Sequence, residues 1–349
     1  MKKFFAGLDQ STTGTKFIIF DSFGKQFLKS YREHKGIFKH AGWIEHNPKE
    51  IWENTQTVIK EGMAEFKSKG YTKENLISLG ITNQRETTAV WDKNTLEPLH
   101  NAIVWNDNRT EGICESMKSK YNNDRQYFKH TNGLMIAPYF SAFKLKWMFE
   151  NQHSLVQKMR ERSLAFGNMD TWVISNLTNG KSHVTDVTNA SRTFMMNLGQ
   201  CQWDSSIYGS VFGFDDSILP EIKPSFSHFG EITAVKELEG VKITGVLGDQ
   251  QAAAFGLNVV KKGDIKVTYG TGCFLILSNG TEMNTNVDGL IGTVLYQKEG
   301  EKPNYAIEGA LSVGAANLNW LKDQLKGFEN FNEMNELLAR RAVERKFND

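Results

Sequence analysis

Two short apolar runs joined by a polar turn, all within the first twenty residues, constrain the fold of this chain more than any other feature. Residues 4–8 and 16–20 are strand-like, and residues 9–15 between them are rich in turn formers and hydroxyl side chains. Residues 21–24 end the second run with another turn. This pattern predicts a β-hairpin whose connection is polar and contains a glycine.

Helix signals follow the hairpin and alternate with further strands. Asn47, Pro48 and Glu50 predict a helix start, with Asn47 as the cap and Glu50 completing a capping box. Apolar residues then recur near the helical period until Gly70. Further strands are predicted at residues 76–82, 103–105 and 243–247, and further helices at residues 140–149 and 155–159. Strands interleaved with helices predict an α/β fold.

A later segment, residues 264–280, repeats the plan of the opening hairpin. An apolar strand at 264–269 leads into a Gly-Thr-Gly turn at 270–272, and a second apolar strand at 273–277 ends in a polar turn. The repetition predicts two related lobes, each offering a phosphate-sized turn to a shared cleft. An ordinary glycine-flanked turn is the alternative.

Composition and charge narrow the class of protein. The 349 residues are enough for two domains or one bilobal body. The chain carries 41 basic and 40 acidic side chains without long basic runs, which argues against a general nucleic-acid or membrane-surface protein. Three widely spaced cysteines exclude a disulfide framework and a CxxC metal site, so we expect a soluble protein of the cytoplasm. The histidines show no metal-ligand spacing, and no P-loop or dinucleotide fingerprint occurs.

The polar turn at residues 9–15 has the composition of a phosphate-binding turn. Hydroxyl and backbone N–H groups are the donors that phosphate oxygens need, and Gly14 would let the backbone approach closely. Asp9 could hold Mg²⁺ directly or through water, and Lys16 could add positive charge. An ordinary surface hairpin is the alternative.

Five polar residues at 83–87 follow the apolar strand that ends near residue 82. A small polyol needs both donors and acceptors, and Arg85 beside Glu86 supplies both in charged form. Because successive strand residues point to opposite faces, the backbone must turn here for both to contact one ligand. An exposed Arg–Glu pair is the alternative.

Asp249 follows the predicted strand at residues 243–247 and precedes a run of small residues suited to a closely packed helix. An Asp at the carboxyl end of a strand is a plausible general base, and plain helix capping is the alternative. The aromatic residues Trp105, Tyr139 and Phe274 lie beside the polar clusters and are candidates either for the core or for ligand contacts.

Taken in order along the chain, these motifs resemble those of the FGGY carbohydrate kinase family, which has the actin/hexokinase-type ATPase fold. The resemblance runs from residue 1 to about residue 325. It is carried by the segments at residues 9–16, 42–48, 83–87, 104–107, 138–141, 185–193, 248–251 and 269–274. The Asn-Gln-Arg-Glu-Thr string at 83–87 is similar to that of the glycerol-using members of the family rather than the sugar-using ones.

The resemblance implies a ribonuclease H-like, two-lobed α/β fold, with the N-terminal lobe at residues 1–248 and part of a C-terminal lobe at residues 249–349. It implies ATP-dependent phosphorylation of glycerol to sn-glycerol 3-phosphate with Mg²⁺, and Asp249 as the base that takes the proton of the terminal hydroxyl. The implied glycerol contacts are Arg85, Glu86, Trp105, Tyr139, Asp249, Gln250 and Phe274. The implied nucleotide or phosphate contacts are Thr12, Thr13, Gly14, Lys16, Thr271, Gly272, Ala315 and Asn319, and Asp9 is the implied metal ligand.

The chain departs from the family pattern in three respects. Ser11 stands where many relatives carry Gly, and Ala315 and Asn319 stand where relatives carry a Gly and a Gln that contact nucleotide. Relatives also continue well beyond residue 349, with a glycine-rich adenosine-binding segment. We therefore expect an incomplete second lobe with an uncovered apolar face, in a chain that keeps the glycerol half of the site but binds ATP poorly.

Two alternative functions stay open. One is a kinase for another small polyol or a ketose, and the other is a catalytically impaired protein that binds glycerol in a regulatory role. The expected partners are glycerol and MgATP. Neither nucleic-acid binding nor membrane insertion is expected, and assembly into a homo-oligomer stays open.

Overall fold

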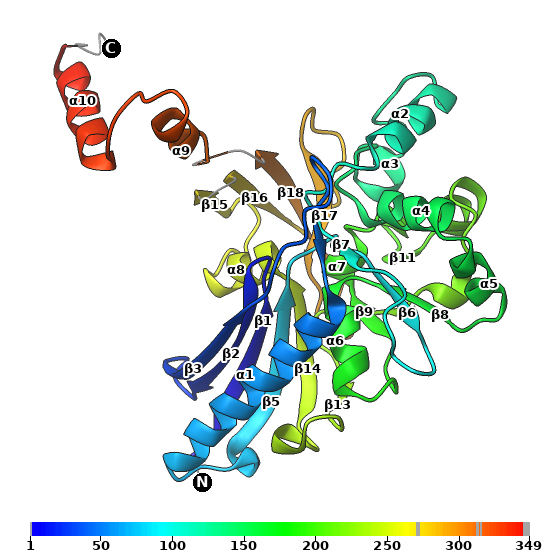
Figure 1. Ribbon diagram of the computed structural model, residues 1–349, viewed down its shortest axis with the longest axis vertical. Helices are drawn as coiled ribbons and strands as arrows, with labels where there is room; N and C mark the ends of the chain where they lie inside the picture. The colour runs from blue at the N-terminus through cyan, green and yellow to red at the C-terminus, as the bar shows by residue number, and fades with distance from the viewer. Residues whose placement is uncertain (1, 270–272, 312–313, 315, 345–349) are drawn as a thin grey trace.

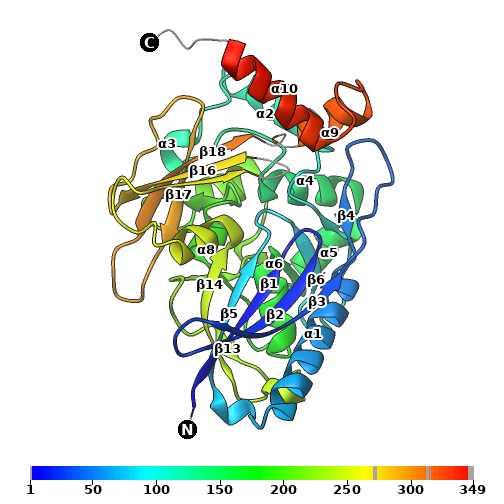
Figure 2. The same cartoon turned by 90° about the vertical axis from the view of Figure 1, so that its left-hand side faces the viewer.

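The structure is a computed structural model that describes residues 2–269, 273–311, 314 and 316–344. Its two largest sheets are a six-stranded sheet formed mainly by the first part of the chain and a four-stranded sheet formed by the later part. Helices cover both sheets, which makes the fold α/β as predicted (Figures 1 and 2).

The six-stranded sheet has the strand order β13-β14-β5-β1-β2-β3. Its strands are β1 (Phe4–Gln10), β2 (Gly14–Asp21), β3 (Gln26–Glu33), β5 (Leu76–Asn83), β13 (Gly230–Glu231) and β14 (Lys242–Gly248). Strands β1, β2 and β3 are antiparallel neighbours, whereas β1, β5 and β14 run parallel to one another. The predicted opening hairpin and the predicted strands at 76–82 and 243–247 are therefore confirmed.

The hairpin connection is shorter than predicted. Asp9 pairs with Lys16 and Gln10 pairs with Thr15 in the β1–β2 ladder, so only residues 11–13 remain outside the strands. The ladder extends because the Ser11 N–H donates to the carbonyl of Gly14 and closes a tight turn, which satisfies backbone groups that a longer loop would leave unpaired.

The register of the three parallel strands brings their carboxyl ends together. Asn83 at the end of β5 lies beside Gln10 of β1 on one side and beside Gly248 of β14 on the other. The residues that follow these strands therefore share one edge of the sheet. In open α/β sheets this edge is where ligands usually bind.

Helix α1 (Pro48–Ser68) packs on the sheet through one apolar face. The Asn47 side chain caps it by accepting a hydrogen bond from the Lys49 N–H, as predicted. The Glu50 carboxylate accepts from the Lys35 N–H instead of completing a capping box with Asn47, because β3 leads a backbone donor to within 3.2 Å of it. Helix α6 (Met169–Leu177) packs into the same core. The buried residues of this core include Ile51, Val58, Phe66, Leu79 and Trp172.

The second sheet lies beyond the carboxyl ends of β5 and β14, with helix α8 (Asp249–Gly256) beside it (Figures 1 and 2). Its strands are antiparallel in the order β15-β16-β18-β17, with bounds β15 (Ile265–Tyr269), β16 (Cys273–Gly280), β17 (Ile291–Tyr296) and β18 (Asn304–Leu311). The predicted second hairpin is confirmed, and its turn at 270–272 lies outside the described residues. Strand β15 is at an edge of the sheet and exposes Ile265, Val267 and Tyr269.

The remaining elements are short and surround the two sheets. The strands are β4 (Glu45–His46), β6 (Ala89–Asp92), β7 (Ala102–Ile103), β8 (Leu164–Gly167), β9 (Val184–Asp186), β10 (Met196–Asn197), β11 (Gln202–Trp203) and β12 (Glu221–Lys223). The helices are α2 (Glu111–Lys120), α3 (Lys129–Asn132), α4 (Ser141–Asn151), α5 (Ser154–Arg160), α7 (Val187–Ala190), α9 (Ala316–Asp323) and α10 (Phe331–Glu344). The predicted strand at 103–105 is displaced to β7, and the predicted helices at 140–149 and 155–159 correspond to α4 and α5. In the part of the chain that the structure describes, every helix is too short or too polar to cross a membrane.

Gly62 gives a test of how closely α1 packs on the sheet. Alanine usually stabilises the middle of a helix by about 0.5–1 kcal/mol over glycine, but a Cβ at Gly62 would lie 2.6 Å from Cδ1 of the buried Phe17. Because overpacking a core costs about 1–3 kcal/mol, we expect Gly62→Ala to lower the free energy of unfolding, measured by urea denaturation. The control is Gly112→Ala in α2, where a Cβ would meet nothing within 4 Å and should stabilise. Equal stabilisation by both substitutions would contradict this packing.

Candidate functional site

The polar residues after β5 turn the backbone as predicted. Glu86 has φ of 57°, a left-handed conformation that is uncommon for any residue but glycine. Arg85 and Glu86 are only 3% and 1% exposed, so the alternative of an exposed ion pair is wrong. Two opposite charges are thus buried next to each other at the carboxyl edge of the sheet, in a strained turn of the kind that is common at functional sites.

Arg85 is held from three sides. Its Nη1 and Nη2 donate to the two carboxylate oxygens of Glu308 at 2.6 and 2.8 Å, a bidentate arrangement. Nη1 also donates to Oε1 of Gln251 at 3.2 Å, and Nε lies 3.3 Å from Oδ1 of Asp249. The guanidinium is therefore fixed in one orientation, in which its Nε faces Asp249.

A second buried arginine, Arg192, contacts the neighbouring carboxylates. Its Nε donates to Oε1 of Glu86, and its Nη1 lies 3.4 Å from Oε2 of Glu308. Among the described residues, Nη1 and Nη2 of Arg192 find no hydrogen-bond acceptor of good geometry. Burial alone would raise the pKa of Glu308, but Arg192 and Arg85 outweigh burial and hold that pKa at about 2. Glu308 is therefore ionised over the physiological pH range.

Asp249 occupies the first position of α8, directly after β14, as predicted. Its Oδ1 accepts a hydrogen bond from the Gln250 N–H at 2.7 Å, and 41% of its side chain is open to solvent, so a ligand can reach it. The pKa of Asp249 is raised to about 6, mainly by burial of the site and also by Glu86 and Glu308, against the lowering effect of Arg85 and of the Gln250 N–H. A carboxylate with a raised pKa that a ligand can reach suits a general base.

The three predicted aromatic residues lie together around a small cavity. The Trp105 ring centroid is 5.6 Å from that of Tyr139 and 6.3 Å from that of Phe274. A cavity of about 200 Å³ is lined by these three residues with Met135, Ala137, Phe140, Arg192, Gly289, Ile291, Glu308 and Ala310. This volume is below the roughly 300 Å³ of drug-sized sites, so the cavity suits a small ligand. Its two charged lining residues, Arg192 and Glu308, are those that contact Glu86 and Arg85.

The turn between β1 and β2 contacts one of the residues that line this cavity. Nε1 of Trp105 donates to Oγ1 of Thr12 at 3.0 Å, which joins the aromatic wall to the turn. Thr13 at the tip is exposed. Behind the turn, Lys16 lies 2.8 Å from Oδ2 of Asp9, whose other oxygen accepts from Ser11 at 2.6 Å. The structure therefore brings the hydroxyl-rich turn next to the aromatic residues and pairs Lys16 with Asp9.

Gly14 has a structural role in the sheet. Gly14 is buried against β3, and its predicted approach to a phosphate stays a prediction. A Cβ at this position would lie 2.5 Å from both the Arg32 carbonyl oxygen and Cε2 of Tyr31. Glycine is required here because the neighbouring strand leaves no space for a side chain.

Several predicted residues lie elsewhere or outside the described chain. Thr271, Gly272 and Ala315 are outside the described residues. Asn319 is exposed on α9, and no hydrogen bond within the described ranges joins it to the cavity. Gln250 follows Asp249, and its Oε1 accepts a hydrogen bond from Nζ of Lys266 on β15 at 2.8 Å.

Sequence reasoning missed three charged residues of this site: Arg192, Lys266 and Glu308. Arg192 lies in the 185–193 segment, which was used for the resemblance without giving that residue a role. Glu308 is the only charged residue in the apolar strand β18. A charge in an apolar strand needs a buried partner, and this signal could have identified Glu308. Its partner, Arg85, is 223 residues away and could not have been named.

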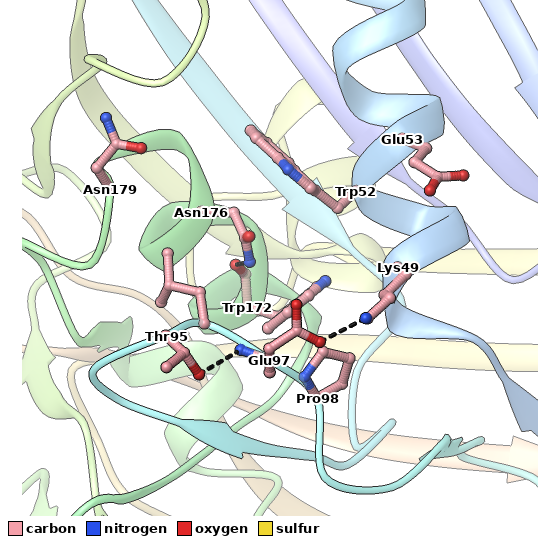
Figure 3. A pocket seen from close by; sticks show the side chains of 10 residues that line it. Lys49, Trp52, Glu53, Thr95, Glu97, Pro98, Trp172, Asn176 and Asn179 are labelled. Atoms are coloured by element: carbon pink, nitrogen blue, oxygen red, sulfur yellow. Dashed lines mark hydrogen bonds and ion pairs between the residues drawn. The ribbon is translucent and has the colours of Figure 1, made fainter.

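Another pocket, of about 290 Å³, lies between α1, the turn at residues 93–98 and α6 (Figure 3). Lys49 and Glu97 form an ion pair across it, and Trp52 and Trp172 contribute ring surface. Both charged partners are more than half exposed. The pocket shares no lining residue with the aromatic cavity, and it contains none of the predicted site residues.

Gly248 allows Arg85 to lie across the end of β14. A Cβ on Gly248 would lie 2.6 Å from Cδ of Arg85, which cannot yield easily because Glu308 holds its guanidinium. We expect Gly248→Ala to displace Arg85 and, because overpacking costs about 1–3 kcal/mol, to lower the free energy of unfolding measured by urea denaturation. Gly256→Ala, at the other end of α8 and with nothing within 4 Å, is the control. An unchanged free energy of unfolding in both variants would contradict this role of Gly248.

Three comparisons with known proteins, by family model, by sequence and by solved structure, all match this chain to carbohydrate kinases. The model of the FGGY family of carbohydrate kinases, N-terminal domain, matches residues 4–256. The chain is 44% identical to glycerol kinase 1 of Streptomyces avermitilis and to a glycerol kinase of Brucella anthropi, covering 92% and 97% of this chain. A solved structure of Plasmodium falciparum glycerol kinase with ADP matches with a TM-score of 0.91 at 36% identity over 97% of this chain. The chain spans 63%, 67% and 67% of the length of these three proteins.

Proposed function

Because the chain belongs to the FGGY family of carbohydrate kinases, we propose that it carries out ATP-dependent phosphorylation of glycerol to sn-glycerol 3-phosphate. The observation that supports this best is the convergence of Arg85, Glu86 and Asp249 beside a small aromatic cavity. Buried donors and acceptors in a space of this size suit a three-carbon polyol. All three proteins named above are glycerol kinases, which supports the same substrate for this chain.

In this proposal Arg85 and Glu86 bind the glycerol hydroxyls, and Gln250 adds a polar contact. Arg85 donates and Glu86 accepts, so a glycerol hydroxyl can accept a hydrogen bond from Arg85 and donate one to Glu86. Trp105, Tyr139 and Phe274 contact the carbon backbone. A substrate that lacks one hydroxyl would leave a buried charged group without its partner, and discrimination against it should be steep.

Asp249 acts as the general base. It takes the proton of the terminal hydroxyl as that oxygen bonds to the γ-phosphorus of ATP, while the bond to the β,γ-bridging oxygen breaks and ADP leaves. Phosphoryl transfer needs mainly in-line positioning and stabilisation of charge, with little covalent participation of the protein. The N–H of Gln250 and the guanidinium of Arg85 orient the Asp249 carboxylate for this proton transfer.

The turn after β1 is proposed to contact the phosphates. Thr12 and Thr13 offer hydroxyl donors, and Asp9 would hold Mg²⁺, which when bound would neutralise phosphate charge. A single carboxylate that is 25% exposed and contacts the Ser11 hydroxyl fits this ion, because Mg²⁺ is commonly held by one or two carboxylates together with substrate phosphates. Lys16 now pairs with Asp9 and would have to turn toward the phosphates to contact them.

Isothermal titration of this chain with glycerol, erythritol and xylulose tests the substrate. We expect glycerol to bind most tightly, and coupled ADP detection with each compound then measures turnover. Tighter binding of xylulose or erythritol would favour the other polyol or ketose kinase. Glycerol binding without any turnover would favour the glycerol-binding regulatory protein, and no binding of any polyol would overturn the proposal.

The raised pKa of Asp249 predicts the pH dependence of the reaction. A base must be ionised, and a pKa near 6 in the folded protein means that Asp249 keeps its proton to a higher pH than an ordinary Asp. We therefore expect kcat/KM for glycerol to increase as the pH is raised through about 6. A rate profile that stays flat down to pH about 4 would contradict the assignment of Asp249.

The other predictions from the sequence stay predictions. They are the lobe boundary between residues 248 and 249, the nucleotide contacts at Thr271, Gly272, Ala315 and Asn319, weak ATP binding, the oligomeric state and the cytoplasmic location.

A further inference from the structure

Glu308 joins the second sheet to the residues proposed to bind glycerol. It lies on β18, it is 1% exposed, and both of its carboxylate oxygens accept hydrogen bonds from Arg85. Since Arg85 follows β5 of the first sheet, this bidentate contact connects the two sheets through one pair of side chains. It also leaves Arg85 a single orientation, because both terminal nitrogens are engaged by one carboxylate.

Glu308 also lies next to the second arginine. Nη1 of Arg192 is 3.4 Å from Oε2 of Glu308, while Nε of Arg192 donates to Glu86. The four buried side chains contact one another in a row in which the charge alternates, in the order Arg85, Glu308, Arg192 and Glu86. Two positive and two negative side chains give this group a formal charge of zero. Each carboxylate contacts an arginine, so neither carboxylate is buried without an opposite charge beside it.

This arrangement orients both residues proposed to bind the substrate. Arg85 is held by Glu308 directly, and Glu86 is held by Arg192, which Glu308 contacts in turn. Without the Glu308 charge, two arginines would face Glu86 and the nearby Asp249. Arg85, already 3.3 Å from Asp249, would then be drawn toward that carboxylate.

We propose that Glu308 is a positioning residue for the polyol site, which holds Arg85 for the substrate and keeps it from pairing fully with Asp249. This inference rests on the proposed function. It adds to that function a residue of the second sheet that borders the aromatic cavity and acts on the substrate by holding Arg85. It means that Arg85 and Glu86, which follow β5, are held in place for the polyol only when β18 is in place.

The test compares glycerol binding by the parent chain, Glu308→Gln and the control Glu45→Gln. Glu45 is also a buried carboxylate, 2% exposed, and is paired with an arginine, Arg109, at 2.8 Å, but it lies on β4 outside the cavity lining. We expect Glu308→Gln to raise the dissociation constant for glycerol by about tenfold to a hundredfold, because a buried charge pair loses one partner. Glu45→Gln should leave the dissociation constant within about twofold while lowering the melting temperature.

The pH dependence of binding distinguishes positioning from a structural role. Asp249 faces the charges of Arg85, Glu86, Glu308 and Lys266. Loss of the Glu308 charge removes one carboxylate that raises the pKa of Asp249 and frees Arg85 to lower it. The pH below which glycerol affinity falls should therefore be lower in Glu308→Gln than in the parent, and unchanged in Glu45→Gln.

A second variant covers the case in which Glu308→Gln does not fold. Glu308→Asp keeps the charge, but its shorter side chain cannot reach Nη1 and Nη2 together, so we expect a folded protein that binds glycerol more weakly than the parent. If either folded variant binds glycerol as tightly as the parent, with the same pH dependence, the role of Glu308 is wrong and the proposed function stands. If the parent itself does not bind glycerol, the proposed function is wrong and this inference falls with it.

Discussion

Asp249→Asn is expected to lower the rate of phosphoryl transfer to glycerol by about 10²–10⁴-fold, the usual contribution of a general base. The amide cannot take the proton of the attacking hydroxyl, although its oxygen can still accept a hydrogen bond from it. Glycerol binding should therefore change far less than turnover. Coupled ADP detection measures the rate, and isothermal titration measures the dissociation constant.

The matched control for this variant is Asp124→Asn, because Asp124 lies exposed in the loop after α2 and its carboxylate accepts a local hydrogen bond from the Gln126 N–H. Turnover of Asp249→Asn within about tenfold of the parent rate would show that another group takes the proton. A parent chain that binds glycerol yet shows no turnover to be lost would instead support the regulatory alternative.

Arg85→Met should have the largest effect on stability. It removes the direct partner of Glu308 and one of the charges that compensate Asp249, and breaking a buried ion pair from one side costs about 3–5 kcal/mol. We expect a loss of this size in the free energy of unfolding, measured by urea denaturation, together with loss of measurable glycerol binding. The control is Arg32→Met, which breaks an exposed pair with Glu61 and should change stability by less than about 1 kcal/mol.

A double variant separates the two effects of Arg85. Adding Glu308→Leu to Arg85→Met removes the uncompensated carboxylate, so stability should recover in part while glycerol binding stays lost. If the double variant is as unstable as Arg85→Met alone, the cost lies in packing rather than in the buried charge.

Local signals in the sequence were enough to predict the elements that carry the site. The hairpin β1–β2 follows from two apolar runs around turn formers, α1 from its cap and apolar period, and α8 from small residues after a strand. The turn at Glu86 was also predicted, because Arg85 and Glu86 could face one ligand only if the backbone left the strand conformation. Each of these predictions depends on residues close together in the chain.

The contacts that make these residues a site depend on the tertiary structure. Glu308 meets Arg85 across 223 positions, and Arg192 meets Glu86 across 106. The packing of β3 requires glycine at position 14, and Asp9 pairs with Lys16 because the β-ladder continues into the segment predicted as the turn. The sequence spacing of these residues contains no information about such distances.

By itself, the sequence determined the α/β class, the positions of the main strands and helices, and the residue types from which a polyol and phosphate site could be built. Those properties follow from periodicity, capping and turn chemistry, which act over a few residues. Only the tertiary structure decided that Arg85 is oriented by a carboxylate of the second sheet and that Asp249 has a raised pKa. Burial and charge pairing set both properties, and they exist only when segments far apart in the chain are packed together.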